Sequence, residues 1–233
     1  MQKIYTGKTK DVYQKENGNY LFHFKDDVTG EDGVVDPGAN QIMGQIKGKG
    51  KMSLELSNHF FKLLQQNNLP THFISADLTQ NTMEVKEARL PGSDTGISGG
   101  LEFICRLYAY GSFVRRYQKY VKEELQPLNY LVEITLKDDE RGDPLINDDT
   151  IAELRVLTPG QQQKAKELTR KAAEIIEQEL KKKELYLVDI KFEFGLAGNE
   201  VILIDEVSAD SMRVMDTNKN FLSHEEIFHK FFS

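Results

Sequence analysis

The stretch LYLVDIKFEFGLAGNEVILIDEVSADSMRVMD, residues 185–216, decides how this chain is expected to fold. Apolar residues alternate with charged ones through residues 185–194, which is the period-2 pattern of a β-strand. Asp189, Lys191 and Glu193 therefore share one face of the strand. The alternation predicts either a charged site carried by a sheet or the solvated face of an amphipathic sheet.

A second strand is predicted directly after the first. Residues 200–207 form a short apolar run that ends in an acidic pair, and a turn precedes it. If residues 197–199 make a three-residue hairpin loop, Lys191 lies opposite Asp205, and Glu193 lies diagonally across on the same face. A two-residue loop would shift the register by one residue and move Asp205 to the other face. A site that holds Mg²⁺ with two carboxylates, leaving positions for water and phosphate, therefore requires the three-residue loop.

Length and charge limit the possible functions. The 233 residues can form one large domain or two lobes that share a cleft. The net charge of −7 argues against general nucleic-acid binding. The single cysteine, Cys105, lies in an apolar run and predicts a buried thiol. No signal-peptide pattern occurs, and no apolar run approaches the ~20 residues of a membrane span, so we expect a cytoplasmic protein without a membrane partner.

The N-terminal part predicts an antiparallel meander. Residues 4–13 have the pattern of a strand, a glycine turn and a second strand, and residues 20–25 predict a third strand. Lys8 and Lys10 are expected on one face, where a glycine beside paired lysines can approach phosphates. The sequence has no GxxxxGK[ST] motif, so this segment is not a P-loop.

Two lobes are expected, residues 1–90 and 91–233, because residues 91–100 have the Gly- and Ser-rich composition of a linker. In the first lobe, KGKGK at residues 47–51 predicts either a loop that closes over an anion or a mobile surface loop. Residues 52–67 then place apolar side chains at helical spacing and predict a core helix.

The second lobe opens with a predicted strand that carries Arg106, followed by a Gly-Ser turn. At a possible helix start, the guanidinium, the Ser112 hydroxyl and backbone N–H groups can together grip a phosphate or a carboxylate. The alternative is an exposed arginine followed by a serine that only caps the helix. The acidic residues 137–149 predict either a loop beside the cleft or a plain surface loop.

Two further helices have clear start signals. Thr158, followed by proline and then by glutamine, predicts the first turn of a helix that runs to residue 183. Ser223, with Glu226 three positions later, predicts the start of a short last helix. The longer helix leads directly into the strand at residues 185–194.

Several separated segments resemble, in order, the family of phosphoribosylaminoimidazole-succinocarboxamide synthases, or SAICAR synthetases, and together they span nearly the whole chain. The matching segments are LVDIKFEFG at 187–195, IDEVSADSMRVMD at 204–216, GKTKDVY at 7–13, Lys49-Gly50, Glu102 with Arg106 and Gly111-Ser112, and DPLIN at 143–147. The chain departs from the family pattern at Gly100-Leu101, after an apparent insertion, at Tyr110, where a small residue is usual, and at Ala209, where proline is usual. The charged positions of the pattern are all retained.

The resemblance implies an α+β fold with an antiparallel, β-rich N-terminal lobe, a mixed α/β C-terminal lobe and an ATP cleft between them. It also implies an ATP-dependent ligase of de novo purine biosynthesis. The implied reaction condenses 5-amino-1-(5-phosphoribosyl)imidazole-4-carboxylate (CAIR) with L-aspartate, through an acyl phosphate, to give SAICAR, ADP and phosphate. Mg²⁺ and a homo-oligomer, expected to be a dimer, are implied as well. The alternatives are a ligase or kinase that acts on a different phosphorylated carboxylate, and a silent nucleotide-binding module.

The resemblance further implies roles for individual residues. Lys191 and Asp189 are implied to be catalytic, with Lys191 neutralising charge on the transferred phosphoryl group. The implied ATP-binding residues are Lys8, Lys10, Lys86, Glu193 and Asp205, of which Glu193 and Asp205 are also the implied Mg²⁺ ligands. The implied substrate-binding residues are Arg106, Ser112, Asp210 and Arg213.

Overall fold

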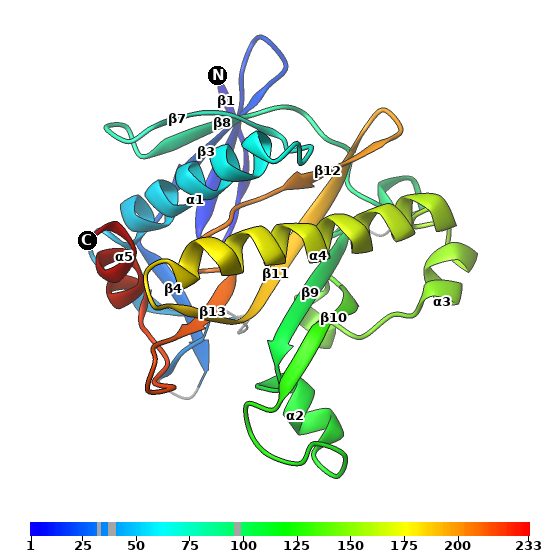
Figure 1. Cartoon of the computed structure of the whole chain (residues 1–233). Helices are drawn as coiled ribbons and strands as arrows, with labels where there is room; N and C mark the ends of the chain where they lie inside the picture. Colours follow the sequence, from blue (N-terminus) through cyan, green and yellow to red (C-terminus); the bar gives the residue numbers. More distant parts are fainter. Residues whose placement is uncertain (32–33, 37–40, 96–98) are drawn as a thin grey trace.

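A computed structural model describes residues 1–31, 34–36, 41–95 and 99–233, which form an α+β fold. The helices are α1 (Lys49–Gln66), α2 (Ser112–Tyr117), α3 (Asp148–Glu153), α4 (Pro159–Lys181) and α5 (His224–Phe232). The two long helices, α1 and α4, run across the same side of the molecule, and α5 lies beside α1 (Figure 1). No helix among the described residues is long and apolar enough to span a membrane.

The N-terminal sheet contains the predicted meander and one later hairpin. Its strands, in spatial order, are β1 (Gln2–Thr6), β2 (Lys10–Gln14), β3 (Tyr20–Phe24), β8 (Thr82–Val85) and β7 (Phe73–Asp77). Neighbouring strands are antiparallel, which confirms the expected meander. A smaller sheet joins β5 (Val34–Val35), β4 (Asp27–Glu31) and β6 (Ile42–Gln45). Helix α1 packs on the N-terminal sheet, where Phe61 stacks on Phe73 with ring centroids 5.4 Å apart.

The C-terminal sheet is centred on the strand predicted at residues 185–194. Its spatial order is β10 (Pro127–Leu136), β9 (Leu101–Tyr108), β11 (Tyr186–Ala197) and β12 (Glu200–Ile204), and β13 (Met212–Met215) also pairs with β11. The pairings described for this sheet are antiparallel. Strand β11 therefore touches three other strands, and its side chains determine the character of both faces.

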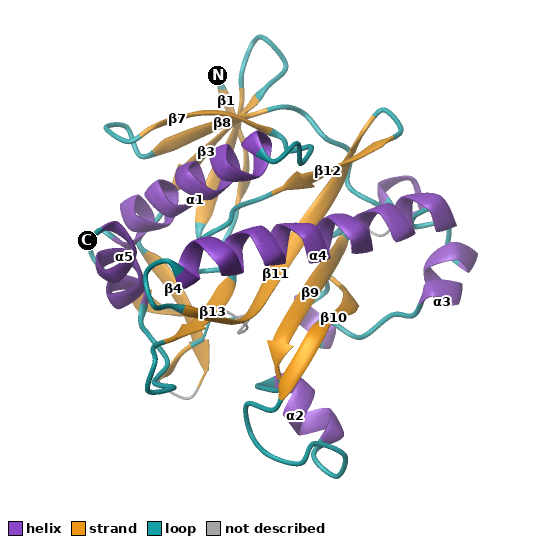
Figure 2. Ribbon diagram, viewed as in Figure 1, coloured by secondary structure: helices purple, strands orange, loops and turns teal. Residues whose placement is uncertain are grey.

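Strand β11 separates the hydrophobic core from a charged surface. Ile190, Phe192 and Phe194 are at most 1% exposed and belong to the core cluster that includes the apolar side of α4. Figure 2 shows α4 running across β11 and β9 on that side. Because side chains alternate along a strand, the charged residues of β11 face away from α4. The period-2 pattern thus arises from a sheet with one face in the core and the other in a polar cleft.

The hairpin between β11 and β12 differs from the prediction. Ala197 pairs with Glu200, so only Gly198 and Asn199 form the loop, and Glu193 lies opposite Ile204. The expected three-residue loop, with Lys191 opposite Asp205, is therefore wrong. Gly198 has a φ of 61°, and this left-handed conformation is what a two-residue loop needs and what glycine adopts without strain.

The helix starts follow the predicted signals. Thr158 and Ser223 each form a capping box with the residue three positions later, which confirms both N-termini. Helix α4 ends at Lys181, two residues before the predicted end. The KGKGK segment is not a free loop, because α1 begins at Lys49, whose side chain is fully buried.

Candidate active site

One face of the C-terminal sheet forms the floor of the site. Asp189 of β11 pairs in register with Arg106 of β9, and Glu193 pairs with Glu102. Lys191 lies between them on the same strand, so the charged side chains of two strands form one surface. The predicted common face of the three β11 charges is confirmed, and the interpretation as a solvated face is wrong because Asp189 and Glu193 are buried.

Two adjoining pockets open above this floor. The arginine pocket is lined by Arg106, Ser112, Arg115, Asp189, Arg213 and neighbouring residues. The lysine pocket is lined by Lys8, Lys10, Lys137, Glu193, Asp205, Glu206, Asp210 and neighbouring residues. Glu102, Lys191 and Ser211 line both pockets, so Lys191 lies where they meet. A group bound in one pocket can therefore be presented to a group bound in the other.

Asp189 holds the two arginines of the arginine pocket. Arg106 donates to Asp189 from Nη1 at 3.0 Å and to Ser112 Oγ from Nη2 at 3.0 Å. Arg213 donates from Nη1 to the same Asp189 oxygen at 2.9 Å, and from Nη2 to Asp36 at 2.7 Å. Burial opposes the charge on Arg213, but Asp189 and Asp36 outweigh it and raise its pKa. The site thus holds two fixed positive charges that suit a phosphate or a carboxylate.

The Gly-Ser turn is part of this pocket. Gly111 precedes α2 with a φ of 57°, and Ser112 is the first residue of that helix, with its hydroxyl 3.0 Å from Arg106. Arg106 is only 3% exposed. The alternative of an exposed arginine beside a capping serine is therefore wrong, since Gly111 occupies the cap position and no side chain caps the helix.

An aromatic pair covers one side of Arg213. The guanidinium carbon lies 5.7 Å from the centroid of the Tyr110 ring, and the Phe221 ring packs on Tyr110 with centroids 4.3 Å apart. Tyr110 is one of the positions where this sequence departs from the family pattern. Its ring contributes a cation–π contact to a guanidinium that is mostly removed from water.

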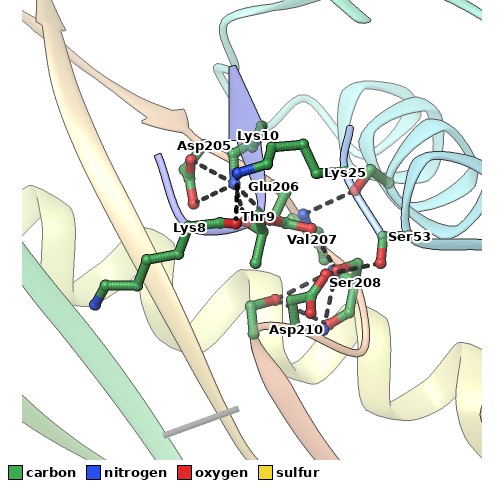
Figure 3. Close-up of polar contacts among 12 residues, drawn as sticks. Lys8, Thr9, Lys10, Lys25, Ser53, Asp205, Glu206, Val207, Ser208 and Asp210 are labelled. Carbon is green, nitrogen blue, oxygen red and sulfur yellow. Dashed lines mark hydrogen bonds and ion pairs between the residues drawn. The ribbon is translucent and has the colours of Figure 1, made fainter. Parts of the chain in front are cut away.

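Ion pairs organise the lysine pocket. Lys10 Nζ lies 3.1 Å from Asp205 and also contacts Glu206, while Lys137 Nζ lies 2.5 Å from Glu193. Figure 3 shows the Lys10 ammonium between the two acidic side chains, with Lys8 extending away from them. Lys8 instead reaches Asp139 at 2.7 Å across the cleft. The pocket therefore presents several ammonium groups around the carboxylates of Glu193, Asp205 and Glu206.

The protonation states follow from these pairs. Burial raises the pKa of Asp205, but Lys10, Lys137 and Lys191 outweigh it and hold that pKa at about 2, so the carboxylate is charged at neutral pH. Burial also opposes the charge on Lys10, yet Asp205 and Glu206 raise its pKa above the ordinary value. Burial dominates at Glu193, whose pKa is raised although Lys137 lowers it.

The backbone conformation of Asp205 places its side chain in the lysine pocket. Strand β12 ends at Ile204, and Asp205 has a φ of 68°, which is unusual for a residue other than glycine. Strand alternation no longer applies beyond Ile204, so the two-residue loop does not carry Asp205 to the far face. The carboxylate lines the lysine pocket together with Glu193, as predicted, but for a different reason.

Glu193 and Asp205 are a suitable pair for Mg²⁺. Among the residues that the structure describes, no group of three or more His, Cys, Asp or Glu side chains is arranged to hold a metal. Two carboxylate donors in a pocket that is also lined by lysines nevertheless fit Mg²⁺, which usually takes its other ligands from water and substrate phosphates.

Two of the predicted site residues differ from the others in their surroundings. Lys86 follows β8 with an exposed side chain and lines neither pocket, so its role in ATP binding stays a prediction. Asp210 lines the lysine pocket, but its carboxylate is occupied by Lys49 and Ser53 at 2.7 Å and by His224 at 3.0 Å. Asp210 therefore fixes the loop after β12 as well as bordering the cavity.

Sequence reasoning missed three charged residues of the site. Lys137 is the one cation at the start of the acidic loop, and Glu206 is the second member of the acidic pair. Glu133 accepts from Arg106 Nε at 2.7 Å and alternates with apolar residues along β10. The loop itself lies beside the cleft, because Asp139 lines the lysine pocket and Asp143 lines the arginine pocket.

Comparisons with known proteins agree on one family. A family model described as SAICAR synthetase matches residues 3–232. A phosphoribosylaminoimidazole-succinocarboxamide synthase from Clostridium tetani is 47% identical over 215 residues, covering 91% of this chain and 92% of the relative. A solved synthase from Ehrlichia chaffeensis has a TM-score of 0.85 at 26% identity, covering 99% and 98% of the two chains. A solved SAICAR synthetase in complex with ADP has a TM-score of 0.82 at 29% identity, covering 98% and 95%.

Proposed function

The chain belongs to the SAICAR synthetase family, and from this premise we propose how its two pockets divide that family's reaction. The enzyme is an ATP-dependent ligase that condenses CAIR with L-aspartate to give SAICAR, ADP and phosphate in purine biosynthesis. The observation that carries the assignment is the position of Lys191, which borders both the arginine pocket and the lysine pocket. A cation at the junction stabilises the charge on a phosphoryl group that is transferred from one pocket to the other.

The chemistry explains why two anion pockets are needed. A carboxylate does not react with an amine at neutral pH, so a CAIR carboxylate oxygen first attacks the γ-phosphorus, and the bond to ADP breaks. The aspartate nitrogen then attacks the carboxyl carbon, loses a proton, and phosphate leaves. Both steps depend mainly on position and on neutralised charge. The protein therefore needs cations aimed at each phosphate and little covalent chemistry of its own.

In this proposal the lysine pocket receives the ATP phosphates. Lys8 and Lys10 come from the turn and strand of the N-terminal sheet, and Lys137 comes from the opposite side of the cleft. The enzyme uses Mg²⁺ with ATP, and Glu193 and Asp205 would hold the ion. When bound, the ion neutralises phosphate charge that the lysines alone leave uncompensated.

The arginine pocket would bind the phosphoribosyl substrate. Arg106 and Arg213 stand on both sides of Asp189, which orients them without occupying all of their N–H groups. The Ser112 hydroxyl adds a neutral donor at the start of α2. Lys191 then faces the carboxylate that must be phosphorylated, and its pair with Glu102 at 2.8 Å keeps it in place.

We also propose the larger organisation of the enzyme. Residues 1–90 and 91–233 form the nucleotide lobe and the substrate lobe, a division supported by the separate N-terminal and C-terminal sheets. A homodimer is supported by the apolar groove between α2 and β10, which is lined by Phe113, Tyr117, Tyr120, Leu128 and Leu131 and where Tyr120 is 83% exposed. A monomeric mass in light scattering at micromolar concentration would contradict the dimer. A cytoplasmic location agrees with the free, buried Cys105 thiol, and cell fractionation tests it.

Substrate omission tests the reaction directly. We expect ADP release and SAICAR formation, followed by absorbance, only when Mg-ATP, CAIR and L-aspartate are all present. L-Glutamate in place of aspartate serves as the matched control. ATP binding without turnover on CAIR would contradict the ligase assignment and indicate a different carboxylate substrate.

Tyr110→Ala is expected to raise the KM for CAIR about tenfold with little change in kcat, because a buried cation–π contact to Arg213 contributes roughly 1 to 2 kcal/mol. Tyr110→Phe keeps the ring and should behave like the wild type. The KM for ATP is the internal control, since Tyr110 does not border the lysine pocket. Equal KM values for CAIR in the alanine and wild-type enzymes would refute the contact's role.

A further inference from the structure

The two sheets meet at a short hydrogen-bonded seam. Leu203 N donates to Pro70 O at 2.9 Å, and His72 N donates to Leu203 O at 2.9 Å. Thr71 and Leu203 form a parallel bridge between these two bonds. The segment before β7 therefore extends alongside the end of β12, two residues before Asp205.

The His72 side chain occupies this seam and is 2% exposed. Its Nε2 lies 3.1 Å from the main-chain oxygen of Asp205. A carbonyl oxygen only accepts, so Nε2 must carry the hydrogen in this contact. Phe22 lies edge-on to the imidazole at 5.6 Å, and Phe61 packs against it at 5.4 Å between centroids. The ring is thus held on two sides with its N–H aimed at the Asp205 peptide.

Asp205 needs such support. A left-handed conformation costs a residue other than glycine of the order of 1 kcal/mol or more, and it persists only where the surroundings impose it. Glycine would remove this cost but would also remove the carboxylate that lines the lysine pocket. The contact with Lys10 reaches only the Asp205 carboxylate and makes no bond to the Asp205 peptide.

We propose that His72 is a positioning residue for the metal and nucleotide site. Its Nε2–H bond to the Asp205 carbonyl holds the left-handed backbone and so keeps the Asp205 carboxylate in the lysine pocket beside Glu193. This inference rests on the proposed role of that pocket in binding Mg²⁺ and ATP phosphates. His72 itself lines neither the lysine nor the arginine pocket, so it acts through Asp205.

The test compares two substitutions that differ in one donor. His72→Gln places an amide N–H at about the reach of Nε2, whereas His72→Met keeps an apolar side chain of similar length without a donor. The readout is the Kd of ADP, measured by titration calorimetry with Mg²⁺ and again with EDTA. We expect His72→Met to weaken binding with Mg²⁺ about tenfold or more, as losing a partner of a metal ligand usually does. Binding in EDTA should change less than about twofold, and His72→Gln should restore most of the affinity with Mg²⁺.

The controls separate this role from general packing. His59 also lies on an aromatic cluster, but it borders neither pocket and contacts Glu179, so His59→Met should leave both ADP affinities unchanged. If His72→Met does not fold, His72→Asn replaces it, because its amide is one carbon too short to reach the carbonyl. Two results would overturn the proposal. One is a His72→Met protein that binds ADP with Mg²⁺ as tightly as the wild type, and the other is a His72→Gln protein that binds it as weakly as His72→Met.

The readout is independent of the assigned reaction. Wild-type protein that binds Mg-ADP but does not condense CAIR would count against the proposed function alone. Wild-type protein whose affinity for ADP is the same with Mg²⁺ and with EDTA would overturn the positioning role, because Asp205 would then hold no metal.

Discussion

Lys191→Met is expected to lower kcat by a factor of about 10² to 10³, the usual cost of removing one fixed charge or donor from a transition state. The side chain keeps its length but loses the ammonium group at the junction of the two pockets. Burial opposes that charge, but Glu102 and Glu193 raise the Lys191 pKa above its ordinary value, so the group is cationic throughout the neutral range. Steady-state kinetics with CAIR, aspartate and Mg-ATP measures the effect.

A structural contribution must be separated from the catalytic one. Lys191→Met leaves Glu102 buried without its ammonium partner, although Thr135 still donates to it at 3.1 Å. Adding Glu102→Gln should recover stability in urea unfolding but should not recover turnover. Lys62→Met, at an exposed position on α1, is the matched control and should leave kcat unchanged. A Lys191→Met enzyme with kcat within about fivefold of wild type would contradict the role of this residue.

Asp189→Ala is expected to lower the free energy of unfolding by about 3 kcal/mol, the low end of the cost of breaking a buried ion pair, because Glu133 still pairs with Arg106 and Asp36 still pairs with Arg213. Two guanidinium groups, those of Arg106 and Arg213, lose their shared acceptor. Total stabilities are about 5 to 15 kcal/mol, so the loss is a large fraction. Urea unfolding followed by circular dichroism measures it.

Adding CAIR gives a second test of the Asp189→Ala protein. The phosphate of CAIR can replace Asp189 as a counterion for Arg106 and Arg213, so CAIR should raise the melting temperature of Asp189→Ala more than that of the wild type. Asp149→Ala removes an exposed carboxylate from α3 and should change stability by less than about 0.5 kcal/mol. A loss below about 1 kcal/mol in Asp189→Ala would show that the shared carboxylate does not hold the arginines.

The fold was largely predictable from local patterns. The alternation along residues 185–194 identified β11 and its charged face, because a strand half in the core must alternate. The capping boxes at Thr158 and Ser223 located the starts of α4 and α5, because these signals act within one turn of helix. These features depend on residues that are neighbours in the sequence, so they can be recognised without the structure.

The site was less predictable because its contacts join distant segments. Lys10 meets Glu206 across 196 positions, and Lys49 pairs with Asp210 from the buried first turn of α1. No local pattern distinguishes these lysines from solvated ones. The predicted hairpin register was wrong for a related reason, because the loop length depends on the conformation of Gly198, which alternation does not reveal. Asp205 is also left-handed, so its side chain does not point to the face that strand alternation assigns to it. Resemblance to the family named the candidate residues, and most of them line the two pockets, but it did not explain their geometry.

The seam at Leu203 has a mechanical consequence. Two domains that open and close about a hinge are usually joined by flexible connections, which absorb rotation in a few backbone angles. Here main-chain hydrogen bonds from Leu203 to Pro70 and from His72 to Leu203 cross the junction close to the reacting groups, and a large rotation would have to break them. We therefore expect surface segments to admit and enclose the substrates, such as the loop that carries Asp139, which lines the lysine pocket, and Asp143, which lines the arginine pocket. The Glu193 and Asp205 carboxylates would then keep a fixed separation while the entrance changes shape.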